Sequence, residues 1–307
     1  MRVVFFGTPD FAVPSLQALL TAKIDVALVV TQPDHGLGHL HRTPRPPAVK
    51  LAAESAGLNI VQPERPRGDD FYVQLRALKA DLGVVVAYGH LLRPELLAIP
   101  RLGFVNVHAS LLPRWRGAAP IHWSVLSGDA ETGVAVMRVE EGLDTGGVWH
   151  VKRTPIGPTD TTGGLFDRLA HLGADALIEA LPRIAAGEAP VPQDDRVATH
   201  APKVSHHDAQ IRWNESAQQV SCRIRAMDPR PGAWSSMAGH EMKLFGPRVV
   251  SAPPGLPGTF VDTDRHLIVA CAGGALEIVE VQPSGKRRMS ALDWIRGSGV
   301  APGAGFE

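Results

Sequence analysis

Between residues 103 and 120 the chain reads GFVNVHASLLPRWRGAAP, its most informative stretch. It begins as an apolar strand pattern and ends as a basic loop with proline and glycine. Side chains alternate between the two faces of a strand, so Asn106 and His108 share one face near the carboxyl end. Ligands of open α/β sheets bind at that end of the strands. The spacing alone favours two polar residues that happen to end a buried strand. The alternative is a polar site in which an amide and an imidazole stabilise negative charge and move a proton.

The rest of the chain fits two domains. Apolar strand-like runs alternate with helical patterns in the first half, which is typical of a parallel sheet covered by helices. The expected strands lie at residues 3–6, 25–30, 59–61, 82–87 and 104–108, and a long helix is expected at 161–186. Later strands are short and evenly spaced, which predicts a small β-barrel. We expect a Rossmann-like α/β domain at 1–190, a linker at 191–206 and a barrel domain at 207–307.

Composition excludes several functions. The net charge is zero, so RNA binding would have to come from local patches of charge. Two cysteines are too few for a disulfide framework or a thiolate metal site. The turn GTPDF at 7–11 lacks the glycine fingerprint of dinucleotide sites, which argues against a nicotinamide dehydrogenase. No apolar run reaches membrane-spanning length and no signal peptide is evident, so we expect a cytoplasmic protein.

Seven motifs resemble the folate-dependent formyltransferases, in the same order and over nearly the whole chain. They are GTPDF at 7–11, TQPD at 31–34, VAYG at 86–89, NVHASLLPRWRGAAPI at 106–121, GDAETG at 128–133, GLDTG at 142–146 and GKRRMSA at 285–291. The resemblance implies an OB-like C-terminal domain. It also implies transfer of the formyl group of 10-formyltetrahydrofolate to methionine esterified to initiator tRNA, by a monomer without a metal ion.

The resemblance implies a catalytic role for Asn106, His108 and Asp144. Formyl transfer needs hydrogen-bond donors for the oxyanion and a group that moves a proton from the amine to the folate nitrogen. A carboxylate beside an imidazole favours the charged form of the imidazole. The glycine-rich loop around Asp144 is able to bring this carboxylate close to His108. From the residues alone, an Asx turn that stabilises the glycine-rich loop is the favoured explanation of Asp144, and the catalytic role comes from the resemblance.

Folate needs a slot with apolar walls and main-chain donors, because a pterin is flat and has many polar edges. The resemblance assigns this slot to two segments and a loop residue: Val86, Tyr88, Gly89, Leu91, Leu92, Ser110, Leu111, Leu112, Pro113 and Leu143. Plain core packing is the alternative for Leu91 and Leu92. His90 and Arg93 depart from the family pattern, which leaves the rim of the slot open.

Candidate tRNA-binding residues are cationic or aromatic. Two guanidinium groups beside an aromatic ring are able to hold phosphate and stack on a base. The candidates are Arg42, Arg114, Trp115, Arg116, Lys286, Arg287 and Arg288. The alternative for Arg114 to Arg116 is a surface cation–π pair, and for the C-terminal cluster a solvated face.

The loop at 34–47 departs most from the family, which places many lysines and arginines there. This chain has His35, His39 and His41 instead, with Arg42 and Arg45 as the fixed charges. A metal site is disfavoured because no cysteine or suitably spaced carboxylate completes it.

Two other functions remain open from the sequence. The formyl acceptor is alternatively a nucleotide-linked amino sugar or another small amine. A non-catalytic RNA-binding protein on the same scaffold is a third reading, although RNA binding alone does not require Asn106, His108 and Asp144 together.

Overall fold

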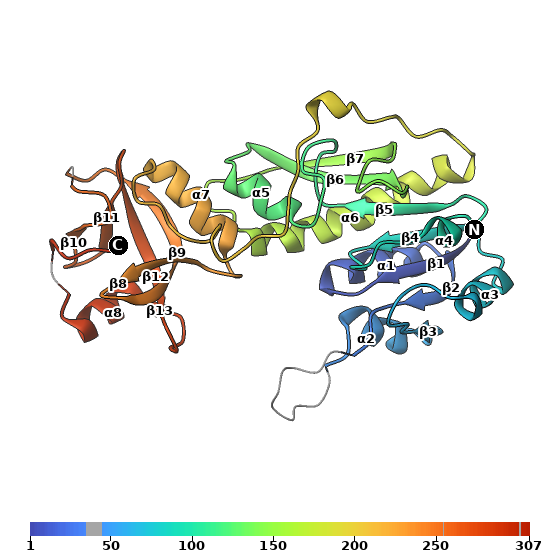
Figure 1. Ribbon diagram of the computed structural model, residues 1–307, viewed down its shortest axis with the longest axis horizontal. Helices are drawn as coiled ribbons and strands as arrows, with labels where there is room; N and C mark the ends of the chain where they lie inside the picture. Colours follow the sequence, from blue (N-terminus) through green and yellow to red (C-terminus); the bar gives the residue numbers. More distant parts are fainter. Residues whose placement is uncertain (35–44, 254, 301) are drawn as a thin grey trace. The chain divides into compact units, whose positions relative to one another are not determined.

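The computed structural model describes residues 1–34, 45–253, 255–300 and 302–307 (Figure 1). The chain forms two compact units. The first comprises Met1–Gly117, Thr132–Thr154 and Phe166–His200, and the second Ala118–Glu131, Pro155–Leu165 and Ala201–Glu307. Residues 118–131 and 155–165 thus belong to the same unit as the C-terminal part of the chain. A single boundary in the sequence cannot describe such a division. The expected boundaries at 190 and 207 stay a prediction.

The first unit is built on a seven-stranded sheet of order β3-β2-β1-β4-β5-β6-β7. Strands β1 to β5 run parallel and β6 pairs antiparallel with β5. The strands are β1 Arg2–Gly7, β2 Asp25–Val30, β3 Ile60–Val61, β4 Leu82–Val86, β5 Phe104–His108, β6 Glu131–Arg138 and β7 Val148–Pro155. The predicted mostly parallel α/β sheet is confirmed.

Helices alternate with these strands along the chain, as Figure 1 shows. They are η1 Asp10–Ala12, α1 Val13–Thr21, α2 Ala48–Ser55, α3 Asp69–Ala77, α4 Pro94–Leu97, α6 Thr162–Ala185 and η2 Asp195–Val197. The long helix expected at 161–186 is α6, which differs from the expectation by one residue at each end. The single turn of α4 is too short to give a helical period.

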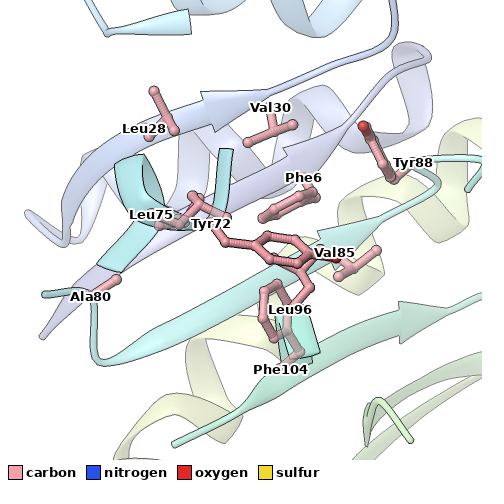
Figure 2. Packing of buried hydrophobic residues seen from close by; sticks show 11 residues of the cluster. Phe6, Leu28, Val30, Tyr72, Leu75, Ala80, Val85, Tyr88, Leu96 and Phe104 are labelled. Atoms are coloured by element: carbon pink, nitrogen blue, oxygen red, sulfur yellow. The ribbon is translucent and has the colours of Figure 1, made fainter. Parts of the chain in front are cut away.

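The central strands are apolar on both faces because helices cover both sides of a parallel sheet. All five residues of β4 are buried. Figure 2 shows the aromatic part of this core, where Phe6 packs edge-on against Tyr88 at 5.3 Å and against Phe104 at 5.4 Å between ring centroids. Gly83 leaves the space for Phe104, since a Cβ there would lie 2.1 Å from its ring.

The second unit contains a six-stranded antiparallel sheet of order β10-β11-β12-β9-β8, with β13 paired to β12. The strands are β8 Ala233–Met237, β9 His240–Val250, β10 Phe260–Asp262, β11 Leu267–Ala270, β12 Ala275–Pro283 and β13 Met289–Ser290. The turn between β8 and β9 has positive φ at Ala238 and Gly239, as in a type I′ hairpin. The predicted small β-barrel domain is confirmed, as an antiparallel half-barrel.

Three helices complete this unit: α5 Pro120–Leu126, α7 Ala217–Met227 and α8 Ala291–Ser298. A capping box of Ser216 and Gln219 begins α7, which packs against α5 and against β9. Within the described residues, no helix is both long and apolar enough to cross a membrane.

Candidate active site

The site lies at the carboxyl end of β5, beside the end of β4. Asn106 pairs with Val85 of β4 and Met137 of β6, and His108 pairs with Ala135 of β6. The two polar side chains therefore share the face that the alternation predicted. Asn106 is half-buried, and its carboxamide has no hydrogen-bond partner among the described residues.

His108 is buried, with 7% of its side chain exposed, and both ring nitrogens face polar atoms. Its Nε2 lies 2.9 Å from the Trp115 carbonyl oxygen. A carbonyl oxygen only accepts hydrogen bonds, so Nε2 carries a proton. Its Nδ1 lies 3.6 Å from Asp144 Oδ2. The structure thus brings together two of the three predicted catalytic side chains and orients the imidazole through a backbone carbonyl.

Asp144 lies in the loop between β6 and β7, in a left-handed conformation with φ 54°. Its Oδ2 accepts a hydrogen bond from the Gly117 amide at 2.8 Å, so one carboxylate oxygen faces both Gly117 and His108. Only 14% of the side chain is exposed. The Asp144 carboxylate therefore contacts a loop distant in sequence and the His108 imidazole, which an Asx turn within its own loop does not explain.

The segment after β4 leaves the sheet next to Asn106. Ala87 and Gly89 have φ values of 47° and 89°, which turn the chain sharply. The Tyr88 carbonyl accepts hydrogen bonds from Thr8 Oγ1 at 3.0 Å and from Gln32 Nε2 at 2.9 Å. A Cβ at Gly89 would lie 2.5 Å from Gln32 Nε2, so the turn requires glycine. These contacts fix a strained turn beside β5, the strand of Asn106 and His108.

The predicted folate residues divide into buried and exposed groups. Val86 and Tyr88 are buried, and Figure 2 shows the Tyr88 side chain in the core. Burial raises the pKa of Tyr88 to about 12. Leu91 and Leu143 are exposed, so core packing does not explain Leu91. Leu92, Leu111, Leu112 and Pro113 are half-buried, while Ser110 is buried and donates from Oγ to the Arg114 carbonyl at 2.6 Å.

The three predicted RNA-binding residues of the basic loop differ in their surroundings. Arg114 is exposed, with its guanidinium 4.5 Å from the centre of the Trp115 ring. Arg116 is buried instead, where Nε donates to Gln193 Oε1 at 3.0 Å and Nη2 lies 2.8 Å from Asp195 Oδ1. These contacts assign Arg116 a role inside the protein.

The C-terminal cluster also divides. Lys286 and Arg287 are exposed. Arg288 lies over the Phe245 ring at 3.9 Å and pairs with Asp228 at 3.0 Å and Glu280 at 2.5 Å. Arg42 and the three histidines of the preceding loop lie outside the described residues. Among the residues that the structure does describe, no group of His, Cys, Asp or Glu has the arrangement of a metal site.

Sequence reasoning missed the polar residues that support these loops. Gln193 and Thr199 lie in the segment interpreted as a linker, yet both hydrogen-bond to the loops of Asp144 and Trp115. Thr8 and Gln32, which fix the Tyr88 turn, lie in the motifs at 7–11 and 31–34 but were given no role. The partners of these four residues lie 49 to 84 positions away in sequence, so local spacing does not reveal the contacts.

Two known protein families match this chain. The family described as formyl transferase matches residues 1–181, and the formyl transferase C-terminal domain matches residues 203–299. The fold and the site are therefore those of a formyltransferase. A protein of Geotalea uraniireducens (strain Rf4) named methionyl-tRNA formyltransferase is 44% identical over 307 residues, which cover 99% of this chain and 97% of the relative. This chain belongs to the methionyl-tRNA formyltransferase family.

Two solved structures share the fold at low sequence identity. An N-formyltransferase from Helicobacter canadensis, in complex with folinic acid and dTDP-3-aminofucose, is 16% identical with a TM-score of 0.70 and covers 92% of this chain and 99% of that one. HypX from Aquifex aeolicus, in complex with tetrahydrofolic acid, is 18% identical with a TM-score of 0.66 over 96% of this chain. This chain spans about half of the HypX chain, 47% of its length.

Proposed function

We propose that this chain transfers the formyl group of 10-formyltetrahydrofolate to the α-amino group of initiator methionyl-tRNA. The observation that carries the chemistry is the Asn106, His108 and Asp144 arrangement at the end of β5. The observation that carries the acceptor is 44% identity over the full length to a methionyl-tRNA formyltransferase. We infer a cytoplasmic monomer, because the proposed acceptor is used there and each chain contributes its own three catalytic side chains.

Asn106 is the proposed donor to the formyl oxygen. The amine nitrogen forms a bond to the formyl carbon while negative charge develops on that oxygen. The Asn106 carboxamide has no protein partner among the described residues, so its N–H groups are available for that charge. Donors placed in advance at a developing oxyanion lower the barrier because they need no reorganisation during the reaction.

His108 and Asp144 are the proposed proton carriers. The bond between the formyl carbon and the folate nitrogen breaks as the amide forms, and one proton passes from the amine to that nitrogen. The imidazole edge that faces Asp144 is 3.6 Å from the carboxylate, close enough for this pair to share a proton after a small movement. The Trp115 carbonyl holds the opposite edge and fixes the ring. Burial excludes water that would compete for the proton.

The described residues fit a folate-binding slot. Exposed Leu91 and Leu143 and half-buried Leu111 and Leu112 supply apolar walls, and the Val86–Gly89 turn supplies main-chain groups. The Tyr88 side chain supports this turn from within the core. The solved relative that holds folinic acid has the same fold, which supports the assignment of a folate.

Arg114, Trp115, Lys286 and Arg287 are the proposed contacts to tRNA. The three cationic side chains are exposed. Trp115 is half-buried, and the Arg114 guanidinium lies over its ring. Arg42 joins this set by its sequence position alone. Arg116 and Arg288 already have carboxylate partners, so we propose that they act on RNA only through the segments that they hold.

The decisive experiment supplies 10-formyltetrahydrofolate with three acceptors: initiator methionyl-tRNA, elongator methionyl-tRNA and a dTDP-linked amino sugar. We expect rapid formation of an N-formylmethionyl ester on the initiator tRNA and none on the sugar. His108→Ala is the control for contaminating activity. Preferential formylation of the sugar would establish the alternative acceptor, which the relative solved with dTDP-3-aminofucose represents.

A further inference from the structure

The segment 191–200 lies against both catalytic loops of the first unit. At one end, Val148 and Val191 exchange two backbone hydrogen bonds of 2.8 and 2.9 Å. At the other end, Thr199 donates to the Pro113 carbonyl at 3.2 Å and accepts from the Arg116 amide at 2.9 Å. Its Oγ1 also accepts from the Trp115 amide at 2.9 Å. The segment is therefore part of the site and not a free tether.

Gln193 is the side chain in this segment that contacts both loops. Its Nε2 donates to the Asp144 carbonyl at 2.9 Å and to the Gly146 carbonyl at 2.7 Å. Its Oε1 accepts from Arg116 Nε at 3.0 Å, and the buried Arg116 pairs in turn with Asp195 at 2.8 Å. A carboxamide is able to donate two hydrogen bonds and accept one in the same plane, and a carboxylate is not.

Both loops need such support because their backbones are strained. Asp144 and Trp115 have φ values of 54° and 63°, in the left-handed region that costs a non-glycine residue about 1–2 kcal/mol. The same two residues contact the two nitrogens of the His108 ring: the Trp115 carbonyl faces Nε2 and the Asp144 carboxylate faces Nδ1. A shift of either loop therefore changes the position of the imidazole relative to the carboxylate.

We infer that Gln193 is a positioning residue, which sets the distance between Asp144 and His108 by linking the loop of Asp144 to the loop of Trp115 through Arg116. The inference rests on the proposed roles of Asp144 and His108. Gln193 touches no reacting atom and acts through these two loops. Gln193→Glu should be at least as harmful as Gln193→Ala, because its carboxylate would oppose the carbonyl oxygens of Asp144 and Gly146.

Kinetics of the full-length chain test this role. We expect Gln193→Ala to lower kcat roughly 10- to 100-fold, because small misplacement of a catalytic group has effects of this size. The KM values for folate and tRNA should change less than about threefold, since ground-state binding does not depend on the His108–Asp144 distance. Arg196→Ala is the matched control: Arg196 lies three residues along the same segment and pairs with exposed Asp194, without contact to either catalytic loop.

A double-mutant cycle separates positioning from general loss of stability. If Gln193 acts through Asp144, Gln193→Ala should cost little further activity in the Asp144→Asn background, since residues that act as one unit are not additive. Full additivity, or unchanged kcat in the single variant, would overturn the inference.

A readout without substrate keeps the inference separate from the proposed function. The imidazole ¹⁵N resonances of His108, assigned by subtraction with His108→Gln, should shift in Gln193→Ala and stay in place in Arg196→Ala. If the His108 resonances shift in Gln193→Ala but the parent formylates no tRNA, the positioning role stands and the proposed acceptor is rejected. If the parent formylates tRNA but the resonances do not shift, the proposed acceptor stands and the positioning role is rejected.

Discussion

Asn106 differs from His108 and Asp144 in its dependence on protein contacts. The imidazole and the carboxylate are each held by a backbone group, whereas the Asn106 carboxamide has no partner among the described residues. A side chain without internal hydrogen bonds contributes little to folding but is free to bind substrate. Stability and activity should therefore separate at this position.

We predict that Asn106→Ala lowers kcat by about 10²- to 10³-fold, the usual effect of removing one oxyanion donor. The melting temperature should stay within about 2 °C of the parent, because no protein hydrogen bond is lost. Single-turnover formylation and thermal unfolding of the same preparations check both parts. A large fall in melting temperature with little change in rate would contradict the assignment of Asn106 to catalysis.

Tyr88 offers the opposite case of a predicted site residue that belongs to the core. Its hydroxyl is buried and has no hydrogen-bond partner among the described residues. Leaving such a group unpaired costs about 1–3 kcal/mol, so Tyr88→Phe should raise the free energy of unfolding at neutral pH by about 1 kcal/mol. The KM for folate should not change, because only the Tyr88 backbone borders the proposed folate slot.

The same substitution has a pH dependence with a defined sign. Burial raises the pKa of Tyr88 to about 12, while the unfolded phenol ionises near its ordinary pKa of 10. The parent therefore loses stability as the pH rises from 10 towards 12, and Tyr88→Phe does not. The stability difference should widen over this range in urea unfolding. Absorbance at 295 nm isolates the ionisation, since the chain has only two tyrosines.

At the scale of elements, glycine determines how closely the β6–β7 loop approaches β6. A Cβ on Gly146 would lie 2.1 Å from the Arg138 carbonyl oxygen, which is backbone and cannot rotate away. We predict that Gly146→Ala displaces the loop, lowers kcat by about 10²-fold and costs about 1–3 kcal/mol of stability.

Gly164 in α6 is the matched control for this substitution. A Cβ there would meet only Thr161 Oγ1 at 3.7 Å, an ordinary contact. Gly164→Ala should therefore stabilise the helix by about 0.5–1 kcal/mol without effect on turnover. Equal activity in both variants would show that the loop tolerates the displacement.

Elements with a long period or a full apolar run could be predicted from the sequence. The helix α6 was expected at 161–186 and lies at 162–185, and β5 was expected at the residues it occupies. The helices α4 and α8 were not expected. The first has four residues, and the second follows a basic turn whose Ser290 cap is recognisable only once the helix is known. Short elements depend on tertiary packing more than on local sequence.

The site was predictable to the extent that it lies on one strand. Alternation along β5 placed Asn106 and His108 together, and the family motif supplied Asp144. The sequence did not reveal that Arg116 points inward, because a basic loop looks the same whether its arginines pair with phosphate or with Asp195. Partners distant in sequence decide such cases.

In the molecule as a whole, α5 belongs to the same compact unit as the C-terminal residues. This helix follows the Trp115 loop in the sequence and packs against α7. Its Ile121 and Val125 are buried, and Thr162 Oγ1 nearby in that unit donates to the Ala226 carbonyl at 2.7 Å. Removal of residues 201–307 would leave these groups without partners.

We predict that a fragment of residues 1–200 melts lower than the full chain and aggregates, because newly exposed apolar residues associate. Ile121→Ser should reduce aggregation of the fragment and destabilise the full chain. Light scattering and thermal unfolding of the four proteins check this. A monomeric fragment with the melting temperature of the full chain would show that α5 is stable without α7.

Charge in the C-terminal unit should govern the salt dependence of tRNA binding, because the chain as a whole has no net charge. Each cation that neutralises a phosphate releases a counterion, which steepens the dependence of affinity on salt. All three cations are exposed, but Arg288 is also paired with Asp228 and Glu280 and stacks on Phe245. Neighbouring cations in one short turn should therefore act differently.

We predict that Lys286→Ala and Arg287→Ala each reduce the slope of log K against log salt by about 0.9 for a duplex contact or about 0.7 for a single strand. Arg288→Ala should leave the slope nearly unchanged but lower the melting temperature, since Asp228, with 11% of its side chain exposed, loses its partner. Affinities measured by filter binding between roughly 50 and 200 mM salt check the slopes. A slope that falls for Arg288→Ala and not for its neighbours would assign the phosphate contact to the paired arginine instead.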